Sequence, residues 1–498
     1  MNPQRQVDRI LDEQAGAQVR VIVHMGGPAA DPDVLPGERD APGRLTRGTR
    51  EVLPEPLRAA RAAALRTGAE GGGVPLARPP APKLAATDEA PPRSLDSLRR
   101  ANLAALAPLL DSEPARRGRA GRSAVRSAFW TSRSALLELD RDDLAALVAQ
   151  TPGIRAVYPD QRVTLPPVSQ SRDLPAAVLE NSASSWGITA SGALAAWGAY
   201  GCRGAGVTVG VLDTGVDPTH PDLRGKVAKW AEFDADGQPV ADSQPHDSAW
   251  HGTHVCGTIA GGNASGQWIG MAPEASLAVG LVLKGGSGSH AQVLAGIHWA
   301  VEQGVDVLSM SLSSPMFGPQ APTAYTDGFL TCLRAGIPVV AAIGNRGAQT
   351  SASTGGDFLA FAVGATDHRD LPAGFSGGQT EVITESTLIP PEHLPLIYTK
   401  PDISGPGVAV TSSVPGASWR ASDGTSMATP HVAGAMALLL SAVPAIRTGL
   451  TGAKRAYFLE DALTGAADEL GESGQDPRFG FGRLNVLRAI ALARQPAS

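Results

Sequence analysis

The sequence predicts an α/β protein with a doubly wound, mainly parallel sheet, preceded by a small α+β domain. Two observations predict the α/β part. Apolar runs rich in Val, Leu and Ile recur at residues 207–213, 276–283, 305–312, 337–344 and 358–366. Helical stretches occupy residues 290–303 and 325–336, between these runs. Continuous apolar strands separated by helices are typical of a parallel sheet that is covered on both faces.

A third observation, the order of the elements before residue 165, predicts the small domain. We expect in turn a strand at 18–25, a helix at 96–110, strands at 124–130 and 134–139, a helix at 141–150 and a last strand at 154–160. This β-α-β-β-α-β order is typical of a two-layer, ferredoxin-like sandwich. Residues 27–94 are rich in Pro, Gly, Ala and Arg and have no sustained apolar period, so we interpret them as a flexible insertion.

The length of 498 residues suits two or three domains. We place the first domain at 1–165, an exposed connector at 166–183 and the α/β domain at 184–498. Residues 377–399 form an unusual Pro-rich insertion within the last of these. A solvated loop is the default interpretation of this insertion, and a loop that contacts substrate or a partner is the alternative.

Composition excludes several classes of protein. Hydrophobic residues make up 43% of the chain and charged residues 18%, which supplies a core and argues against a disordered chain. The net charge of −6 does not suit nucleic-acid binding, which favours basic domains. No stretch approaches the roughly 18 apolar residues of a membrane span, and the first residues lack the apolar core of a secretory signal. We therefore expect no nucleic acid and no membrane partner, and we assign no compartment.

Cysteine is scarce and does not decide the redox compartment. Cys202, Cys256 and Cys332 are scattered, so they form neither a disulfide framework nor a zinc site. Each is expected to be a small buried residue. His251 and His254 stand three residues apart, but no third ligand accompanies them at a metal-binding spacing, and His254 is expected to pack or cap locally.

Four polar residues stand where the functional groups of such a sheet gather, at strand ends and helix starts. Asp213 ends the first strong strand and Asn345 follows another, while His251 and Ser426 each begin a helix rich in small residues. Each has a structural explanation: a turn for Asp213 and Asn345, packing for His251 and an N-cap for Ser426. Each also has a catalytic one, and the occurrence of all four together favours a catalytic site.

The segments around these residues resemble the subtilisin-like serine peptidases. The motifs are VLDTGVDPTHPDL around Asp213, HGTHVCGT around His251, AAIGNRG around Asn345 and GTSMATPHVAGA around Ser426. Asp, His and Ser also follow the chain order of the subtilisin triad. Four further segments extend the resemblance over residues 184–490: GMAPEASL, MSLSSP, KPDISGPG and GFGRLN.

The resemblance implies a role for each residue. Ser426 is the expected nucleophile, His251 the general base and then the general acid, and Asp213 the group that orients the imidazole. Asn345 is expected to donate to the oxyanion together with the backbone N–H of Ser426. The residues expected to bind the substrate are Gly286, Ser287, Gly288, Ser311, Leu312, Ser313 and Gly344.

Departures from the family pattern leave two properties open. The family usually has a glycine where this chain has Ser313 and a small residue where it has Ile343, so the preferred substrate side chain is not defined. The loop GGNASGQWIG keeps the length of a calcium loop that many relatives have, and Asp222 is present, but Ala264 occupies one ligand position. No cofactor is therefore expected for the chemistry, and a structural calcium is less favoured than its absence.

The N-terminal domain has a family interpretation as well. LDRDDLAALVAQTPGIRAVYPDQRVTL, at 139–165, is similar to the end of the inhibitory pro-domain of these enzymes. The similarity implies a domain that assists folding, blocks the cleft with its C-terminal tail and is cut off between Gln161 and Ser185. The alternative is a small interaction module that shares the same order of elements.

The sequence thus predicts a serine endopeptidase that hydrolyses protein or peptide substrates through an acyl-enzyme on Ser426 and is made as a self-inhibited proform. The alternative is a latent, protease-like binding protein that its N-terminal domain caps permanently. A nucleotide-binding protein is excluded, because no phosphate-loop glycine pattern opens a βα unit.

Overall fold

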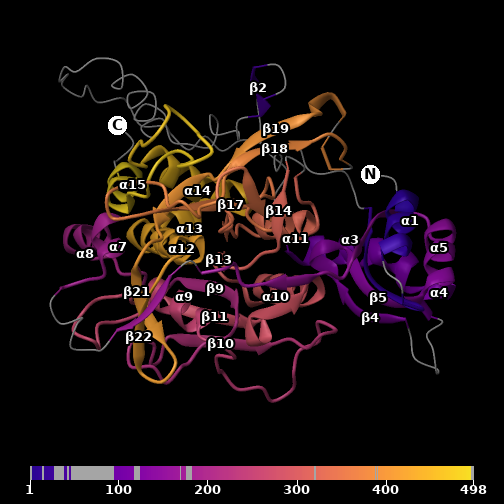
Figure 1. The fold of residues 1–498 in the computed structure, drawn as a ribbon, viewed down its shortest axis with the longest axis horizontal. Helices are drawn as coiled ribbons and strands as arrows, with labels where there is room; N and C mark the ends of the chain where they lie inside the picture. The colour runs from indigo at the N-terminus through magenta and orange to yellow at the C-terminus, as the bar shows by residue number, and fades with distance from the viewer. Residues whose placement is uncertain are drawn as a thin grey trace.

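A computed structural model gives the arrangement of the chain (Figure 1). It describes residues 3–13, 16–26, 39–41, 44–45, 95–116, 124–168, 170–174, 182–318, 321–386, 388–389 and 391–494. Within this part of the chain, no helix is long and apolar enough to cross a membrane. The three cysteines are free and buried, as expected for small core residues.

The larger sheet has seven strands, and all neighbouring strands are parallel. In spatial order they are β10 (Val227–Glu232), β11 (Ser276–Leu281), β9 (Thr208–Asp213), β13 (Val307–Met310), β15 (Val339–Ala342), β17 (Phe361–Thr366) and β20 (Ile403–Pro406). The predicted doubly wound α/β fold is confirmed. β9, which bears Asp213, lies inside the sheet between β11 and β13.

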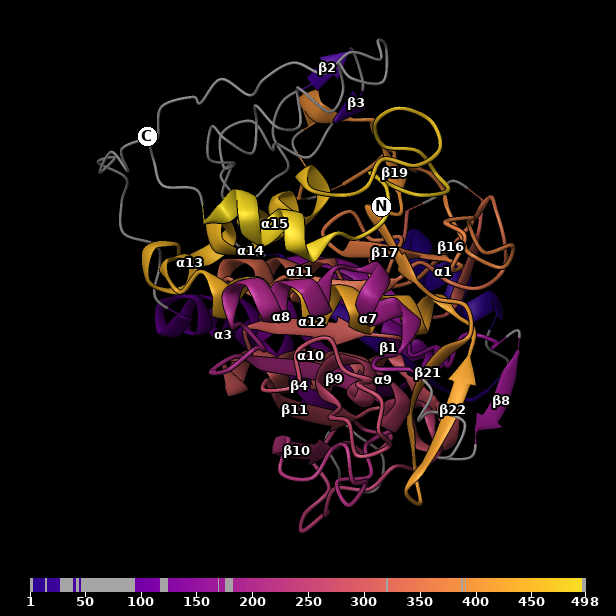
Figure 2. The ribbon, with the colours of Figure 1, turned by 90° about the vertical axis from the view of Figure 1, so that its left-hand side faces the viewer.

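Helices cover both faces of this sheet (Figures 1 and 2). The helices on and around it are α7 (Trp186–Ala190), α8 (Ala193–Tyr200), α9 (His251–Ala260), α10 (His290–Gln303), α11 (Thr326–Arg334), α12 (Thr425–Ala442), α13 (Ala445–Gly449), α14 (Gly452–Gly465) and α15 (Val486–Ala493). Two separate apolar clusters result, one with α10 and α11 and one with α9 and α12. Because strand side chains alternate, Leu212 of β9 belongs to the first cluster and Val211 to the second.

The N-terminal domain is a four-stranded antiparallel sheet with helices packed against it. Its strands, in spatial order, are β4 (Val125–Phe129), β5 (Ser134–Asp140), β1 (Gln18–Met25) and β6 (Ile154–Pro159). Its helices are α1 (Pro3–Glu13), α3 (Leu95–Leu110), α4 (Glu113–Arg116), the short η3 (Trp130–Ser132) and α5 (Arg141–Gln150). With β1 central between β5 and β6, this is the strand order of a ferredoxin-like sandwich. α1, whose Val7 and Ile10 are buried, was not predicted from the sequence.

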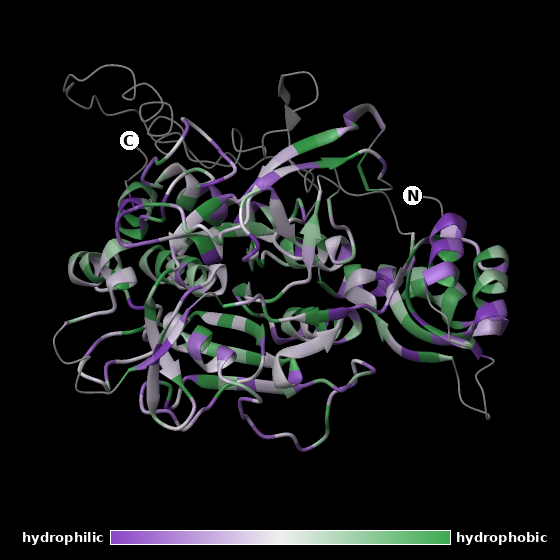
Figure 3. Cartoon of the chain, in the orientation of Figure 1, coloured by the Kyte–Doolittle hydropathy of each residue, from purple (hydrophilic) through white to green (hydrophobic). Residues whose placement is uncertain are grey.

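The N-terminal domain packs against α10 and α11 of the larger domain. Phe129 and Trp130 belong to the same apolar cluster as Leu294 and Phe329. Figure 3 shows hydrophobic residues in the strands of both sheets, whereas α1 at the outer end of the N-terminal domain is largely hydrophilic. The interface between the domains is therefore continuous with the core.

In the connector expected at 166–183, residues 167 and 170–173 are exposed and residue 166 is buried, but the backbone on either side of residue 166 pairs with the larger domain. β7 (Arg162–Thr164) pairs antiparallel with β12 (Ser287–Ser289), which follows the short η4 (Lys284–Gly286). β8 (Ser171–Leu174) pairs with β22 (Ser418–Ser422), itself paired with β21 (Val410–Val414) (Figure 2). In both pairings, an extended segment adds to the edge of a strand that is distant in the sequence. The bonds are formed by backbone groups, so the pattern of side chains does not predict them. The stretch 175–181 lies outside the described residues.

The two insertions also differ from expectation. Residues 377–399 are not a solvated loop: β18 (Gln379–Ile383) and β19 (Leu396–Lys400) form a hairpin, with η5 (Pro391–His393) between them, and Gln379 and Glu381 are buried. Of residues 27–94, only β2 (Arg39–Ala41) and β3 (Arg44–Leu45) are described, and β3 pairs with β19. The remainder of the insertion lies outside the described residues. Another small antiparallel pair consists of β14 (Pro315–Phe317) and β16 (Thr350–Ala352).

Candidate active site

Asp213 and His251 form a buried pair at the carboxyl end of β9. His251 is the first residue of α9, and its Nδ1 lies 2.8 Å and 3.0 Å from the two carboxylate oxygens of Asp213. Both side chains are fully buried. Because Nδ1 faces a carboxylate, it carries the ring proton, and Nε2 is left as the acceptor. In the described part of the chain, Nε2 has no hydrogen-bond partner, so its lone pair is available to a reacting hydroxyl.

Ser426 stands in the first turn of α12, where backbone N–H groups have no intrahelical partner. Its Oγ donates to the carbonyl oxygen of Ser311 at 3.3 Å. The Oγ of Ser311 donates in return to the carbonyl oxygen of Ser426 at 3.0 Å. In this conformation the Ser426 hydroxyl is therefore bonded to Ser311 and not to His251.

Asn345 follows β15, and its amide is fixed from the helix that bears Ser426. Its Oδ1 accepts hydrogen bonds from the backbone N–H of Thr425 at 2.9 Å and from the Thr425 hydroxyl at 2.8 Å. These two bonds leave Nδ2 to donate elsewhere, and it donates to the carbonyl oxygen of Pro167 at 2.9 Å. The preceding residue, Gly344, has φ +106°, a conformation that favours glycine. This role of Thr425 was not predicted from the sequence, although Thr425 directly precedes Ser426.

Four of the residues expected to bind the substrate hold the chain's own linker (residues 161–185): Gly286, Ser287, Gly288 and Ser313. In the pairing of β7 with β12, Thr164 lies opposite Ser287 and Val163 opposite Gly288. The N–H of Leu165 donates to the carbonyl oxygen of Gly286 at 3.1 Å. On the other side, the N–H of Ser313 donates to the carbonyl oxygen of Thr164 at 3.3 Å. Residues 162–165 thus lie as a strand between the two segments.

The linker continues past Ser426 on the other side of the site. The N–H of Asp423 donates to the carbonyl oxygen of Gln170 at 3.0 Å, and β8 then pairs with β22. Both Asp423 and β22 directly precede Ser426 in the chain. The linker is therefore held on both sides of the Ser426 hydroxyl.

A cavity of about 150 Å³ lies beside Asn345 and the linker. Its lining residues are Thr164, Leu165, Pro166, Pro167, Ser313, Pro315, Gly344, Asn345, Arg346 and Ser351. Pro166 is buried, whereas Arg346 is exposed. The cavity therefore has one wall from the linker and the others from segments that follow β13 and β15.

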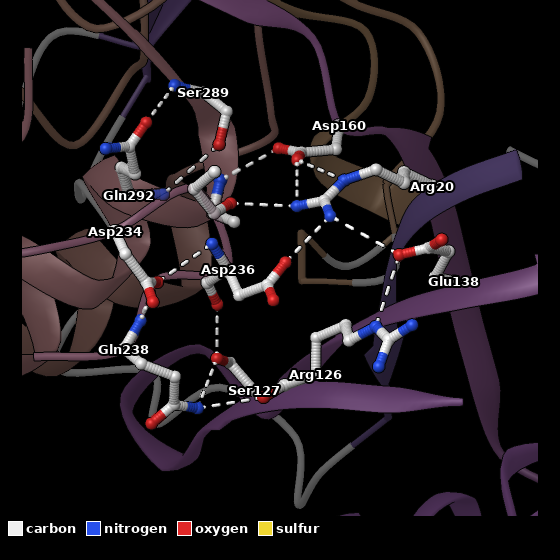
Figure 4. A network of polar contacts seen from close by, with 12 residues as sticks. Arg20, Arg126, Ser127, Glu138, Asp160, Asp234, Asp236, Gln238, Ser289 and Gln292 are labelled. Atoms are coloured by element: carbon white, nitrogen blue, oxygen red, sulfur yellow. Dashed lines mark hydrogen bonds and ion pairs between the residues drawn. The ribbon is translucent and has the colours of Figure 1, made fainter. Parts of the chain in front are cut away.

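A polar network joins the N-terminal domain to the larger domain (Figure 4). Arg20 of β1 is its centre: its guanidinium donates to Asp236 at 2.7 Å and to the carbonyl oxygen of Ala235 at 2.8 Å. It also lies 3.3 Å from Asp160, whose other carboxylate oxygen accepts from the N–H of Ala291 in the first turn of α10 at 3.0 Å. Asp160 thus links a helix N-terminus, which favours a carboxylate, to the arginine.

A second charged cluster lies almost completely buried between the domains. Asp327 of α11 has no exposed surface and forms ion pairs with Arg133, at 2.6 Å, and with Arg155 of β6. His24 of β1 lies 3.3 Å from the same carboxylate. Burial and the two nearby arginines hold the pKa of His24 well below its usual range, so this imidazole is neutral.

Two residues that the sequence singled out as possible metal ligands, His254 and Asp222, form hydrogen bonds within the protein. His254 Nε2 donates toward the carbonyl oxygens of Val410 and Arg420 at 3.1 Å and 3.0 Å, which agrees with the expected local role. Asp222 accepts from the N–H of Ala264 at 2.6 Å and from the Trp419 indole at 2.8 Å. A carboxylate held by two N–H donors, beside an alanine, does not fit a calcium ligand set, and we derive no step through a cation.

Comparison with known proteins agrees with this geometry. Residues 204–482 match the subtilase family. Subtilisin E of Bacillus subtilis (strain 168) is 37% identical over 294 residues, which cover 58% of this chain and 67% of that protein. A subtilisin of Bacillus pumilus is also 37% identical over 294 residues, covering 92% of its length. An intracellular serine protease of Paenibacillus polymyxa is 37% identical over 243 residues, 48% of this chain and 67% of that protein.

The fold and the site define a serine peptidase. More particularly, the chain belongs to the subtilase family and is a subtilisin-like serine endopeptidase that acts on protein or peptide substrates. The matching region begins at residue 204, after the N-terminal domain. The role of that domain is therefore argued from its contacts.

Proposed function

We propose that Ser426, His251, Asp213 and Asn345 carry out the hydrolysis and that the N-terminal domain holds the chain as a self-inhibited proform. The observation that carries the proposal is the hydrogen bond from Asn345 Nδ2 to the carbonyl oxygen of Pro167. The amide that would bind a substrate carbonyl during catalysis binds the linker instead. A substrate strand has to replace residues 162–167 before it can reach Ser426.

In the proposed mechanism, the substrate lies antiparallel to β12. The Ser426 hydroxyl leaves the Ser311 carbonyl, gives its proton to His251 Nε2 and attacks the substrate carbonyl carbon. The developing oxyanion accepts hydrogen bonds from Asn345 Nδ2 and from the Ser426 N–H. Asp213 stabilises the imidazolium that forms.

His251 then gives the proton to the leaving amine, the C–N bond breaks, and an acyl-enzyme on Ser426 remains. Water enters where the amine has left, loses a proton to His251 Nε2 and attacks the ester carbon. The proton returns to Ser426 Oγ as the acid product leaves, which restores the free enzyme. Each step uses groups that the described chain contains.

Maturation is proposed to cut the linker between Gln161 and Ser185, the segment that crosses the site. A permanent cap is the second candidate, and the apolar contact between the domains favours it. Phe129 and Trp130 share an apolar cluster with Leu294 and Phe329, so undocking would expose apolar side chains to water. The two candidates differ in whether the linker is ever cut.

The test is the intact mass of the purified wild-type chain beside Ser426→Ala, with Ser418→Ala, an exposed serine at the turn end of β22, as the control. We expect the wild type and the control to split within 161–185, while Ser426→Ala stays whole. A whole wild-type chain that still reacts with a fluorophosphonate probe would support the permanent cap. Equal splitting of Ser426→Ala, or no labelling even after the linker is nicked, would contradict the assigned nucleophile.

A further inference from the structure

The cavity beside Asn345 lies where a substrate side chain is needed. Asn345 holds the carbonyl oxygen of Pro167, and Pro166 and Pro167 both line the cavity. In the proposed mechanism, the carbonyl held by Asn345 belongs to the residue that precedes the scissile bond. A substrate in place of the linker would therefore direct the side chain of that residue toward the cavity.

The cavity wall carries one charge among the described residues, that of Arg346. Its volume of about 150 Å³, with the linker in place, leaves room beside the linker for part of a substrate side chain. Ser313, where the family usually has a glycine, adds a hydroxyl to the wall. A cationic group with a neighbouring hydroxyl is a favourable surrounding for a carboxylate.

The linker provides no negative charge to pair with Arg346. Its residues at the cavity are Thr164, Leu165, Pro166 and Pro167, none of which is acidic. Arg346 is exposed and forms no ion pair with any residue in the described ranges. The linker backbone thus forms the hydrogen bonds expected of a substrate backbone, but no linker side chain at the cavity pairs with the charge of Arg346.

We infer that Arg346 makes the enzyme prefer an acidic residue, Asp or Glu, immediately before the scissile bond. The inference rests on the proposed function, because it uses Asn345 to locate the reacting carbonyl. The guanidinium is planar and can hold both oxygens of a carboxylate, which a neutral amide of the same shape cannot match.

An acidic group behind the wall, Glu381, limits this preference at high pH. Gln379 Nε2 donates both to Ser351 of the cavity wall, at 3.1 Å, and to buried Glu381, at 3.0 Å. Burial raises the pKa of Glu381 to about 7, with Ser351, Gln379 and Lys400 opposing this shift and Asp357 adding to it. Glu381 gains its charge as pH rises through 7 and then repels an acidic substrate, so the preference is largest below pH 7.

The test uses the full-length chain, activated by nicking of the linker, and peptides that differ only in Glu, Gln or Lys before the scissile bond. For the wild type we expect kcat/KM for Glu to exceed that for Gln by about fivefold or more, with the ratio falling as salt rises. Arg346→Gln should bring the ratio close to one, and Arg346→Glu should reverse it in favour of Lys. Arg369→Glu, an exposed arginine outside the cavity, is the matched control and should behave like the wild type.

The outcomes separate this inference from the proposed function, because Ser426→Ala is measured in parallel. Hydrolysis that depends on Ser426 but is equal for Glu and Gln, or unchanged in Arg346→Gln, would overturn the role of Arg346 alone. Absence of any Ser426-dependent hydrolysis would overturn the proposed function, and the inference with it.

Discussion

The side-chain amide of Asn345 donates a 2.9 Å hydrogen bond to the carbonyl oxygen of Pro167, a residue of the chain's own linker. The same Asn345 accepts two hydrogen bonds from Thr425, the neighbour of Ser426. The donor is therefore held in place by the helix that bears the proposed nucleophile. Inhibition and catalysis would then depend on a single amide, which makes Asn345 the first residue to test.

Two replacements of Asn345 distinguish the role of its Nδ2 donor from that of its Oδ1 acceptor. Asn345→Asp keeps an oxygen for Thr425 but loses the N–H donor, whereas Asn345→Ala loses both. We expect either change to lower kcat by about 10²–10³ with little change in KM, because the lost bond acts mainly in the transition state. Steady-state kinetics of the activated chain would measure this. A kcat for Asn345→Asp equal to that of the wild type would contradict the role of the amide.

Arg20 is expected to strengthen the docking of the N-terminal domain. Arg20→Ala removes the contacts with Asp236 and the Ala235 carbonyl, and its side chain is one-third exposed, so the expected loss is about 1 kcal/mol, or about fivefold. Hydrogen exchange of the Leu165 amide, measured in the Ser426→Ala chain, reports release of the linker from β12. Arg9→Ala on the exposed face of α1 is the control. Unchanged protection of Leu165 in Arg20→Ala would show that the network does not hold the domain.

Docking is expected to weaken as pH falls below about 6.5. His24 is neutral in the docked state, where its pKa is lowered, whereas an exposed histidine has a pKa of about 6.5. The undocked state therefore binds more protons at low pH, and docking loses up to about 1.4 kcal/mol per pH unit below that value. His290, whose pKa is lowered to about 4, acts in the same direction if it too becomes exposed.

The groups that face His24 are Asp327, Arg133, Arg155, His290 and the ring of Tyr158. Hydrogen exchange of the linker amides at pH 7.5 and 5.5, corrected for the intrinsic exchange rates, would measure the effect. His24→Gln should reduce the pH dependence. Docking that is equally strong at both pH values, or equally pH-dependent in His24→Gln, would contradict the assignment to His24.

Loss of the Asp327 charge should destabilise the whole chain. Asp327→Asn leaves Arg133 and Arg155 buried without a counter-charge, and breaking such a cluster costs about 3–5 kcal/mol. Chemical unfolding would measure the loss, with Asp12→Asn on exposed α1 as the control. A change within about 1 kcal/mol would show that the arginines find other partners.

Local patterning was enough to predict much of the fold. The strands that became β9, β11, β13, β15 and β17 are apolar runs, and the helices between them have their own period. Secondary structure of this kind depends on neighbours in the sequence. The expected positions of Asp213, His251, Asn345 and Ser426 followed from short motifs. Each motif joins the functional residue to the neighbours that form a strand end or a helix start.

The linker and the 377–399 hairpin were not predictable in the same way. Val163 is buried because β7 lies against β12, and Glu381 is buried because β18 packs against other parts of the larger domain. Neither segment has a side-chain pattern that shows which distant strand its backbone will meet. The backbone N–H and C=O groups that form these pairs are the same for every residue except proline.

The sequence by itself determined the family, the two folds and the residue types of the proposed catalytic group, because these depend on local pattern and motif. Only the tertiary structure decided that the linker lies across Ser426, that Asp327 is enclosed with two arginines and that Arg346 stands at a cavity. Burial, charge pairing and hydrogen-bond partners depend on segments far apart in the chain, and these meet only when the two domains pack together.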